Sequence, residues 1–184
     1  NGMFAFALYD KEEKKFLLAR DRYGIKPLYY THSDNFFSFA SEQKAILQNP
    51  NFRKELNLNG LKEYFTFQNF FSNETLFKDI KSFPAGNYAY LSLNNSKKLK
   101  LNQYWDFDFF SRKLDLNFND ASEKFKQIFN RAVKRQLVSD VEIGSYLSGG
   151  IDSGSITSVA SKKIKNMKTF TCGFDLTYAS TLEL

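Results

Sequence analysis

The hexapeptide Ser-Gly-Gly-Ile-Asp-Ser, which begins at Ser148, has the residue types of a phosphate-binding loop. Gly149 and Gly150 let the backbone approach an anion without a Cβ in the way. The hydroxyls of Ser148 and Ser153 are additional hydrogen-bond donors. The carboxylate of Asp152 can hold a divalent cation that phosphate oxygens share. Together these groups predict a site for the phosphates of a nucleotide.

The segments on either side of this loop must position it. Residues 141–147 are rich in β-branched and aromatic types and predict a short strand. Ile156, Val159 and Ala160 have helical spacing and predict an amphipathic helix over 155–163. A loop that enters a helix faces the free N–H groups and the positive dipole end of its first turn, and both favour an anion.

Two simpler interpretations of the loop compete with this one. Gly-Gly alone would form only a tight turn, with Asp152 or Ser153 as the N-cap of the helix. A Walker-type loop is the second, but no Gly-Lys-Ser/Thr follows the glycines. Without that lysine the loop is poorly suited to the transfer of a γ-phosphoryl group. The strand–loop–helix context favours a phosphate loop over the plain turn.

Ser-Gly-Gly-Ile-Asp-Ser resembles the pyrophosphate loop (PP-loop) of ATP pyrophosphatases, which cleave ATP between the α- and β-phosphates. The flanking sequences Ser-Asp-Val from Ser139 and Thr-Phe-Thr-Cys-Gly-Phe-Asp from Thr169 resemble the glutamine-hydrolysing asparagine synthase family in particular. The resemblance implies a set of ATP- and pyrophosphate-binding residues: Tyr146, Leu147, Ser148, Gly149, Gly150, Asp152, Ser153 and Cys172. Within it, Asp152 is the expected catalytic and Mg²⁺-binding residue, and backbone around Tyr146, Leu147 and Cys172 is expected to receive the adenosine.

The first hundred residues predict an antiparallel sheet with short helices, and this pattern alone names no function. The strand at 2–9 is apolar at almost every position, so we expect it to be buried on both faces. Ser41 and Asn59 are the candidate N-caps of the two helices. The predicted strands cover 2–9, 16–20, 28–30, 36–40 and 89–93, and the predicted helices cover 41–47 and 57–68. We expect the aromatic residues after the second helix to pack in a core or a domain interface.

Several short sequences in this half carry a second resemblance. Gly-Met-Phe-Ala-Phe-Ala-Leu-Tyr-Asp from Gly2, Arg-Asp from Arg20, Pro-Leu-Tyr from Pro27 and Ala-Ser-Glu from Ala40 are similar to the closing half of the glutaminase domain of class II amidotransferases, an N-terminal-nucleophile (Ntn) hydrolase sandwich. That family releases ammonia from glutamine with an N-terminal Cys whose own α-amine is the base. Neither this nucleophile nor the family's glutamine clamp is in the sequence, so we expect the chain alone to be inactive.

The single cysteine, Cys172, cannot replace the nucleophile, because it is internal and lies in a predicted strand as a small buried hydrophobe. One cysteine excludes an internal disulfide framework and fits a reducing compartment. The chain also has only one histidine, which is far from Cys172 in sequence, and this argues against a zinc site. Arg20 and Asp21 are interpreted as a structural ion pair or sheet-edge support rather than as catalysts.

The second half has a different pattern. A helix is predicted over 120–138, followed by the strand at 141–147, the loop, the next helix and a strand at 168–174. This order predicts the opening of a doubly wound sheet, where ligands bind beyond the carboxyl ends of the strands. The expected fold class is α/β overall: a partial α+β Ntn-hydrolase-type sandwich, then the start of a doubly wound parallel α/β (PP-loop, adenine nucleotide α-hydrolase-like) domain. The expected boundaries are 1–105 for the end of the glutaminase domain, 106–118 for a connector and 119–184 for the start of the synthetase domain.

By resemblance, the parent enzyme is a ligase that converts aspartate to asparagine through an acyl-adenylate, with ammonia from glutamine and with AMP and pyrophosphate as products. ATP and Mg²⁺ are the implied cofactors. The implied partners are glutamine and an acceptor carboxylate, which is aspartate by default. The expected assembly is a homodimer. No run of about 18 apolar residues occurs, so we expect no membrane partner. No nucleic-acid partner is expected either, and the expected location is the cytoplasm.

Three alternatives stay open. The spacer that follows Asp175 resembles family members associated with surface-polysaccharide clusters, for which the acceptor would be a sugar carboxylate. The net charge of +6 permits a PP-loop enzyme that modifies tRNA, although the glutaminase-like first half argues against it. The chain begins at Asn1 and shows no terminating signal at Leu184, so we expect a piece of a longer protein, and an inactive fragment is the third alternative.

Overall fold

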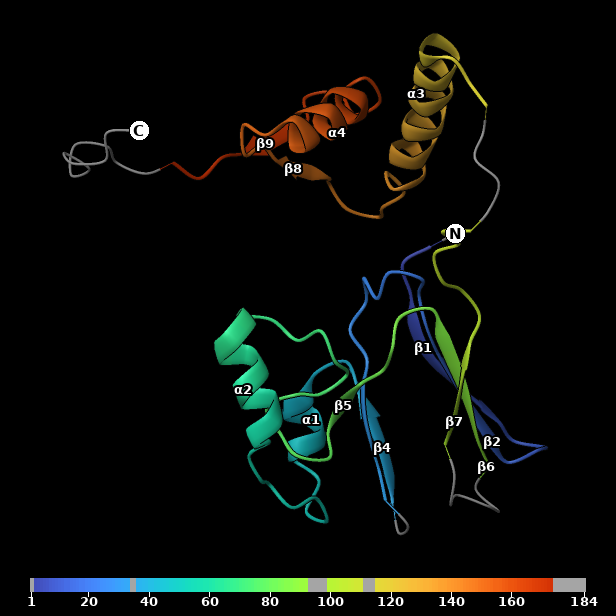
Figure 1. The fold of residues 1–184 in the computed structure, drawn as a ribbon, viewed down its shortest axis with the longest axis vertical. Helices are drawn as coiled ribbons and strands as arrows, with labels where there is room; N and C mark the ends of the chain where they lie inside the picture. The colour runs from blue at the N-terminus through green and yellow to red at the C-terminus, as the bar shows by residue number, and fades with distance from the viewer. Residues whose placement is uncertain (1, 34–35, 93–98, 111–114, 174–184) are drawn as a thin grey trace, which may run out of the picture. The chain divides into compact units, whose positions relative to one another are not determined.

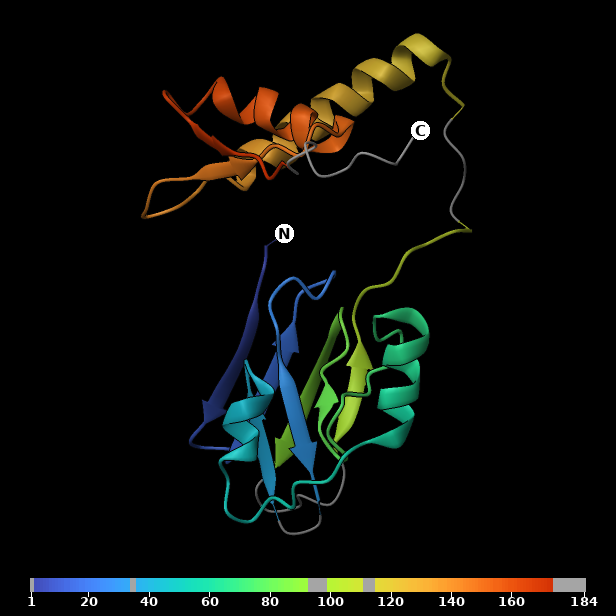
Figure 2. The ribbon, with the colours of Figure 1, turned by 90° about the vertical axis from the view of Figure 1, so that its left-hand side faces the viewer.

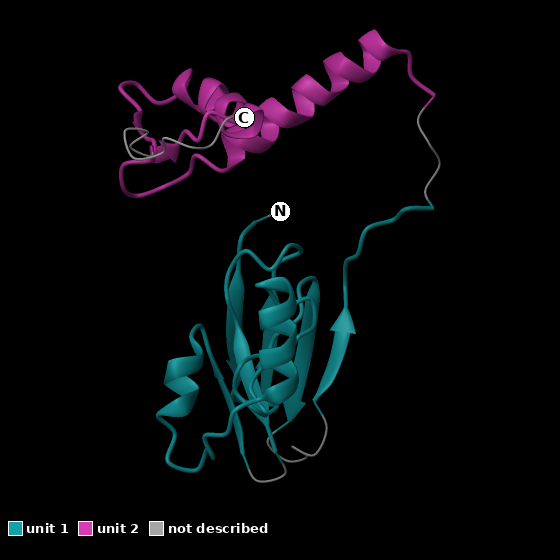
Figure 3. Ribbon diagram, turned by 60° about the vertical axis from the view of Figure 1, so that its left-hand side comes forward, with its two compact units in different colours: residues 1–111 teal, residues 112–184 magenta. Residues whose placement is uncertain are grey.

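The computed structural model of the chain describes residues 2–33, 36–92, 99–110 and 115–173. It divides the chain into two compact units, residues 1–111 and 112–184, which Figure 3 colours separately. Each unit has its own sheets and helices.

Unit 1 contains a four-stranded antiparallel sheet (Figure 1). Its strands are β1 (Ala5–Asp10), β2 (Lys15–Arg20), β6 (Asn87–Ser92) and β7 (Lys100–Gln103), in the order β1-β2-β6-β7. The predicted hairpin of the first two strands is confirmed, with Leu8 opposite Leu17. Next to it, β6 pairs with β2 although nearly seventy residues separate them in sequence, with Leu18 opposite Ala89.

A second, three-stranded antiparallel sheet has the order β4-β3-β5. Its strands are β3 (Tyr29–His32), β4 (Phe37–Ala40) and β5 (Lys81–Ser82). The predicted hairpin of β3 and β4 is confirmed, and residues 34–35 of its turn lie outside the described part of the chain.

The main core of unit 1 lies between the two sheets, which are seen side by side in Figure 1 and one in front of the other in Figure 2. Leu18 of β2 and Ala89 of β6 come from the first sheet and are fully buried. They form one cluster with Tyr30 of β3 and with Leu28 and Phe83, which flank the second sheet. Side chains from both sheets therefore share one apolar layer, and these antiparallel sheets are consistent with the expected Ntn-type amidotransferase architecture.

Helix α1 (Gln43–Leu47) covers the other side of the second sheet, where Ile46 packs with Phe52 and Ile80. Its N-cap is Glu42, and no side chain caps it, so the expectation that Ser41 caps this helix is wrong. The physical reason is local: the helix begins two residues after Ser41, and the Glu42 carboxylate pairs with Lys44 at 2.6 Å instead of with the first-turn N–H groups.

The expectation that the first strand is buried on both faces is also wrong. β1 lies at the edge of its described sheet, and the side chains of Phe6, Leu8 and Tyr9 are 43%, 54% and 41% exposed. Tyr9 keeps one aromatic neighbour, Phe16 of β2, at a ring-centroid distance of 4.8 Å. Burial depends on what packs over a strand, and the strand's own apolar sequence does not reveal that.

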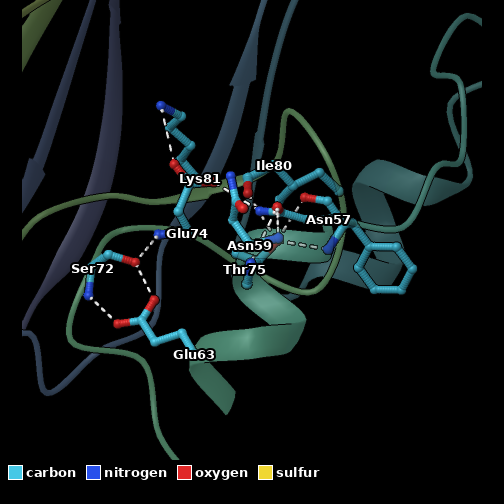
Figure 4. A network of polar contacts seen from close by, with 10 residues as sticks. Asn57, Asn59, Glu63, Ser72, Glu74, Thr75, Ile80 and Lys81 are labelled. Carbon is cyan, nitrogen blue, oxygen red and sulfur yellow. Dashed lines mark hydrogen bonds and ion pairs between the residues drawn. The ribbon is translucent and has the colours of Figure 1, made fainter. Parts of the chain in front are cut away.

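The N-cap of helix α2 (Leu58–Phe67) is Asn57 and not the expected Asn59. The side-chain oxygen of Asn57 accepts hydrogen bonds from the backbone N–H groups of Asn59 and Gly60, at 3.1 and 3.2 Å. Its Nδ2 donates to Oε2 of Glu74 at 2.9 Å, as Figure 4 shows. One asparagine therefore both caps the helix and ties it to the 72–81 segment.

The same polar network also contacts α2 through Glu63, in the middle of the helix (Figure 4). Glu63 of the helix accepts hydrogen bonds from the backbone N–H and the hydroxyl of Ser72, at 2.8 and 2.5 Å. Thr75, which is 1% exposed, donates its hydroxyl to the carbonyl of Ile80 at 2.8 Å. The network fixes a helix whose apolar side chains are largely exposed: Phe65 is 76% exposed.

The expected core packing of the aromatic residues after α2 is confirmed only in part. Phe77 packs against the cluster of Ile46 and Ile80. Phe71 is instead 75% exposed, and its ring meets Phe67 at a centroid distance of 5.2 Å.

Unit 2 contains α3 (Phe118–Arg135), β8 (Gly144–Tyr146), α4 (Ile151–Ser161) and β9 (Lys168–Phe170). β8 and β9 are parallel, with Tyr146 opposite Phe170, and α4 lies between them in sequence. A strand, a helix and a parallel strand form a βαβ unit, which is the building block of doubly wound sheets.

The elements of unit 2 were all predicted, with shifted ends. α3 begins at Phe118, two residues before the expected position, because the side chain of Asn117 caps it by accepting from the N–H of Asp120 at 2.9 Å. β8 is shorter than the expected strand at 141–147. β9 ends at Phe170, and position 174 of the expected strand lies outside the described part of the chain. Among the described helices, none has the length and apolarity that a membrane span needs.

Candidate nucleotide-binding site

The loop at 147–150 leaves the carboxyl end of β8 beside the carboxyl end of β9. The N–H of Leu147 donates to the carbonyl of Phe170 at 2.8 Å, so the pairing of the two strands continues one residue past β8. The loop then leads directly into α4. This is the edge at which ligands bind in parallel α/β sheets.

Two serines close the loop on itself. The hydroxyl of Ser153 donates to the carbonyl of Gly150 at 3.1 Å. Its oxygen also receives the backbone N–H of Ser148 at 3.3 Å and lies 3.0 Å from the Ser148 hydroxyl. Because Ser153 has one hydroxyl proton, already used on Gly150, the Ser148 hydroxyl is the donor in that pair. Both donors of Ser148 therefore converge on one oxygen at the start of α4.

Gly149 has φ +83°, a conformation that favours glycine. A Cβ on this residue would meet nothing within 4 Å, so the backbone angle, and not crowding, requires the glycine. The open space beside it leaves the loop backbone accessible.

The N-cap of α4 is Gly150, which has extended dihedral angles and no capping side chain. The simpler interpretation, in which Asp152 or Ser153 caps the helix, is therefore wrong, and the helix begins at Ile151 rather than at Ser155. The early start has a physical cause: the Gly150 carbonyl accepts the N–H of Gly154 at 3.0 Å and the Ser153 hydroxyl, which together close the first turn.

Asp152 lies in the first turn of α4 and is exposed. In the described part of the chain its carboxylate forms no hydrogen bond or ion pair, and no group of three or more potential metal ligands occurs there. A Mg²⁺ ion that arrives with a nucleotide typically takes one or two carboxylates and completes its shell with phosphate oxygens and waters. One free carboxylate at the loop fits that type of ion.

The residues expected to receive the adenosine lie on both strand ends. Tyr146 is 85% exposed, and its ring is 6.3 Å from that of Phe170, which is 56% exposed. Cys172 is exposed and follows β9 instead of lying within it, so its expected burial in a strand is wrong. The strand ends earlier because the pairing with the 144–147 segment stops at Phe170.

Three side chains at this edge were not singled out from the sequence. The hydroxyl oxygens of Ser145 in β8 and Thr157 in α4 are 2.7 Å apart and join strand to helix. The hydroxyl of Thr171 donates to the carbonyl of Leu147 at 2.8 Å. These contacts join residues 12 and 24 positions apart, so no local motif reveals them.

Arg20 and Asp21 of unit 1 do not form the expected ion pair in the part of the chain that the structure describes. Arg20 donates to the backbone carbonyls of Gly24, Lys26 and Phe83 at 2.8, 2.8 and 2.6 Å. These bonds tie the turn after β2 to the segment before β6. Arg20 therefore has structural contacts, as expected, but they join loop segments through carbonyl groups instead of supporting a sheet edge.

Asp21 is 1% exposed and accepts four backbone hydrogen bonds, at 3.0 to 3.2 Å. The donors are the N–H groups of Phe4, Tyr23, Ile25 and Lys26. Burial alone raises the pKa of the Asp21 carboxyl, but these hydrogen bonds outweigh it and hold the pKa below its usual range. A buried carboxylate bonded only to backbone organises a turn and has no free lone pair aimed at a substrate.

Comparison with known proteins finds a family match in each of the two units. Residues 1–105 match the family described as glutamine amidotransferase domain, and residues 124–182 match the family described as asparagine synthase. A segment of the glutamine amidotransferase domain family is therefore followed in this chain by a segment of the asparagine synthase family. The chain belongs to the glutamine-hydrolysing asparagine synthase family.

Individual relatives agree with this assignment. Asparagine synthetase [glutamine-hydrolyzing] 3 of Bacillus subtilis is 38% identical over 161 residues, which are 87% of this chain and 25% of the relative. Asparagine synthetase [glutamine-hydrolyzing] 2 of the same organism is 35% identical, over 92% of this chain and 24% of the relative. A putative asparagine synthetase of Methanocaldococcus jannaschii is 31% identical, over 98% of this chain and 35% of the relative. The chain thus spans about a quarter to a third of the length of these relatives.

Proposed function

We propose that the full-length protein uses ATP and ammonia from glutamine to convert an acceptor carboxylate into an amide, with aspartate as acceptor and asparagine as product. The observation that carries this proposal is the loop at Ser148, which runs from the end of β8, beside the end of the parallel strand β9, into the N-terminus of α4 and is closed by the contacts of Ser148 with the Ser153 hydroxyl oxygen. Membership of the family supports the same reaction.

In this proposal the two halves of the chain have separate tasks. Residues 1–105 are the closing part of a glutaminase domain, 106–118 are a connector, and 119–184 begin a PP-loop synthetase domain with a doubly wound sheet. The chain by itself has no N-terminal nucleophile and is inactive as a glutaminase. Asp21 and Arg20, which are bonded to backbone groups, maintain the glutaminase half without acting on substrate.

The loop stabilises a leaving pyrophosphate. An oxygen of the acceptor carboxylate attacks the α-phosphorus of ATP, the bond from this phosphorus to the bridging αβ oxygen breaks, and the electron pair leaves with pyrophosphate. Backbone N–H groups at Gly149 and in the first turn of α4 donate to the β- and γ-phosphate oxygens. The Ser148 N–H and hydroxyl join them when they exchange the Ser153 oxygen, which they contact in the free loop, for a phosphate oxygen. Ammonia then attacks the acyl carbon of the acyl-adenylate and loses a proton, and AMP leaves as the amide forms.

Asp152 is the residue that would hold Mg²⁺, which neutralises phosphate charge when it is bound. The adenosine lies over the strand ends, against backbone at Tyr146, Leu147 and Cys172. Exposed aromatic rings at Tyr146 and Phe170 provide an apolar surface there. Since the Cys172 contact uses backbone, its exposed thiol is not required for the reaction.

The test uses the full-length protein with MgATP, an amide-nitrogen donor and one acceptor at a time. We expect asparagine to form from aspartate with either glutamine or ammonium chloride as donor, with glutamate released in the first case. A parallel reaction with a hexuronic acid distinguishes the sugar-carboxylate alternative. Amide formation on the sugar acid and none on aspartate would contradict the proposed acceptor, and no ATP-dependent amide formation on either would contradict the proposed reaction.

A further inference from the structure

Thr171, to which the proposed reaction gives no task, is hydrogen-bonded to the first peptide unit of the loop. Its Oγ1 donates to the carbonyl oxygen of Leu147 at 2.8 Å. The N–H on the other side of that peptide bond belongs to Ser148, and it donates to Oγ of Ser153 at 3.3 Å. The Leu147–Ser148 peptide unit is therefore held at both ends, from the end of β9 and from the first turn of α4.

The two contacts are mechanically linked. In a planar trans peptide unit the C=O and the N–H point in opposite directions. A hydroxyl that fixes the Leu147 carbonyl therefore also fixes the direction of the Ser148 N–H. The N–H of Leu147 is bonded to Phe170 at 2.8 Å, so rotation is restricted on the preceding unit as well.

We propose that Thr171 is a positioning residue for ATP: by holding the Leu147–Ser148 peptide unit, its hydroxyl presets the start of the loop and with it the next backbone donor, the Gly149 N–H, for the pyrophosphate. This inference rests on the function proposed above. A donor that is already oriented loses less entropy when the ligand arrives, so the contact contributes to affinity without touching the nucleotide. Thr171 is exposed and acts through one O–H···O bond, so its hydroxyl, and not its bulk, carries the role.

A purely structural role for Thr171 makes a different prediction. If the hydroxyl only tied β9 to β8, its removal would lower the stability of unit 2. It would also weaken the binding of every ligand at this edge of the sheet to the same extent. A positioning role is specific to the β- and γ-phosphates. AMP, which lacks them but has the same adenosine and α-phosphate, therefore separates the two roles.

The experiment compares four forms of the full-length protein: wild type, Thr171→Val, Thr171→Ser and Thr169→Val. Thr169→Val is the matched control, because its residue lies in β9 and its hydroxyl forms no hydrogen bond within the described residues. The probes are Mg²⁺ with the non-cleavable analogue α,β-methylene-ATP, and AMP. For each form the Kd of both probes, the KM for ATP, the kcat of ammonium-dependent amide formation and the melting temperature are measured.

We expect Thr171→Val to raise the Kd of the analogue and the KM for ATP roughly three- to tenfold, the ratio expected for one exposed hydrogen bond. Its Kd for AMP, its kcat and its melting temperature should stay close to those of wild type. Thr171→Ser should restore analogue binding, and Thr169→Val should not impair it.

Wild-type binding of the analogue by Thr171→Val, or equal weakening of analogue and AMP, would overturn the positioning role while leaving the proposed function intact. A wild-type protein that binds no analogue and forms no amide would overturn the proposed function, and this inference with it.

Discussion

The hydroxyl oxygens of Ser148 and Ser153 lie 3.0 Å apart, on either side of the turn that starts α4. This contact shows that the loop is ordered by its own hydrogen bonds before any ligand is considered. Gly149, Gly150, Ile151 and Asp152 lie between them in sequence, and the carboxylate of Asp152 has no partner in the described part of the chain. Asp152 is therefore a free carboxylate beside a loop that its own hydrogen bonds hold in place.

In the full-length protein, Asp152→Asn should reduce ATP-dependent amide formation by about a hundredfold or more, because it removes the charge proposed to hold Mg²⁺. Glutamine hydrolysis, which the proposed function assigns to the other half, should stay within about twofold of wild type. The two activities are measured separately, as asparagine formed from ammonium and as glutamate released. Asp115→Asn, at an exposed position before α3, is the control. Native amide formation by Asp152→Asn would contradict the assigned role.

Two glycines of this region should respond to alanine with opposite signs. Gly149 has φ +83°, so Gly149→Ala should destabilise the loop by about 1–2 kcal/mol. Gly154 lies within α4, where alanine should stabilise the helix by about 0.5–1 kcal/mol. Neither Cβ would meet an atom within 4 Å, so packing does not complicate the comparison.

Hydrogen exchange of peptides that span 151–161 measures the local effect. Faster exchange in Gly149→Ala and slower exchange in Gly154→Ala are expected. A neutral Gly149→Ala would show that the loop does not need its left-handed residue.

The buried Asp21 predicts a pH dependence of unit 1. Its pKa is below the ordinary value because four backbone hydrogen bonds outweigh burial, so its stabilising contribution is present above about pH 4 and is lost as pH falls through the folded pKa. Asp21→Asn should lower the free energy of unfolding at pH 7 by about 1–3 kcal/mol, because an amide cannot accept all four bonds. The difference from wild type should shrink as the pH falls below 4.

The fluorescence of Trp105, the single tryptophan, follows this unfolding in unit 1. Glu12→Gln, in the exposed turn between β1 and β2, should match wild type throughout. An Asp21→Asn variant with the stability of wild type at pH 7 would disprove the proposed support of the turn.

The 184-residue chain by itself should release no glutamate from glutamine above a no-protein control. Its single cysteine, Cys172, is exposed after β9, and an internal residue lacks the free α-amine that an Ntn nucleophile uses as base. Glutamate is quantified after prolonged incubation with the purified chain. A clear excess over the control, abolished by Cys172→Ser, would contradict the division of tasks between the two halves.

The order β8, loop, α4, β9 was predictable because each part has a local signature: β-branched residues, two glycines, and apolar residues at helical spacing. The ends were not. The start of α4 depends on the Ser153 hydroxyl bonding back to Gly150, and the capping of α2 depends on Asn57 reaching Glu74 across 17 residues. Competing polar side chains near a helix start differ too little in intrinsic preference for sequence alone to choose among them.

Contacts between distant residues were beyond sequence reasoning. Nothing in the residues near Thr171 indicates that its hydroxyl meets Leu147, because strand pairing creates that contact. The exposure of β1 was missed for a related reason: its apolar sequence is compatible with burial, but packing partners decide whether burial occurs. Arg20 and Asp21 are adjacent in sequence, yet they are directed to different backbone groups.

The most direct test of the central claim is the identity of the nucleotide products. The full-length protein is incubated with MgATP, glutamine and aspartate, and the nucleotides are separated by chromatography while asparagine is counted. A loop without the Walker lysine that leads into the uncapped N-terminus of α4 should hold the whole β,γ-pyrophosphate as the leaving group. The account predicts AMP and pyrophosphate in a one-to-one ratio with asparagine. ADP and inorganic phosphate in that ratio would contradict it.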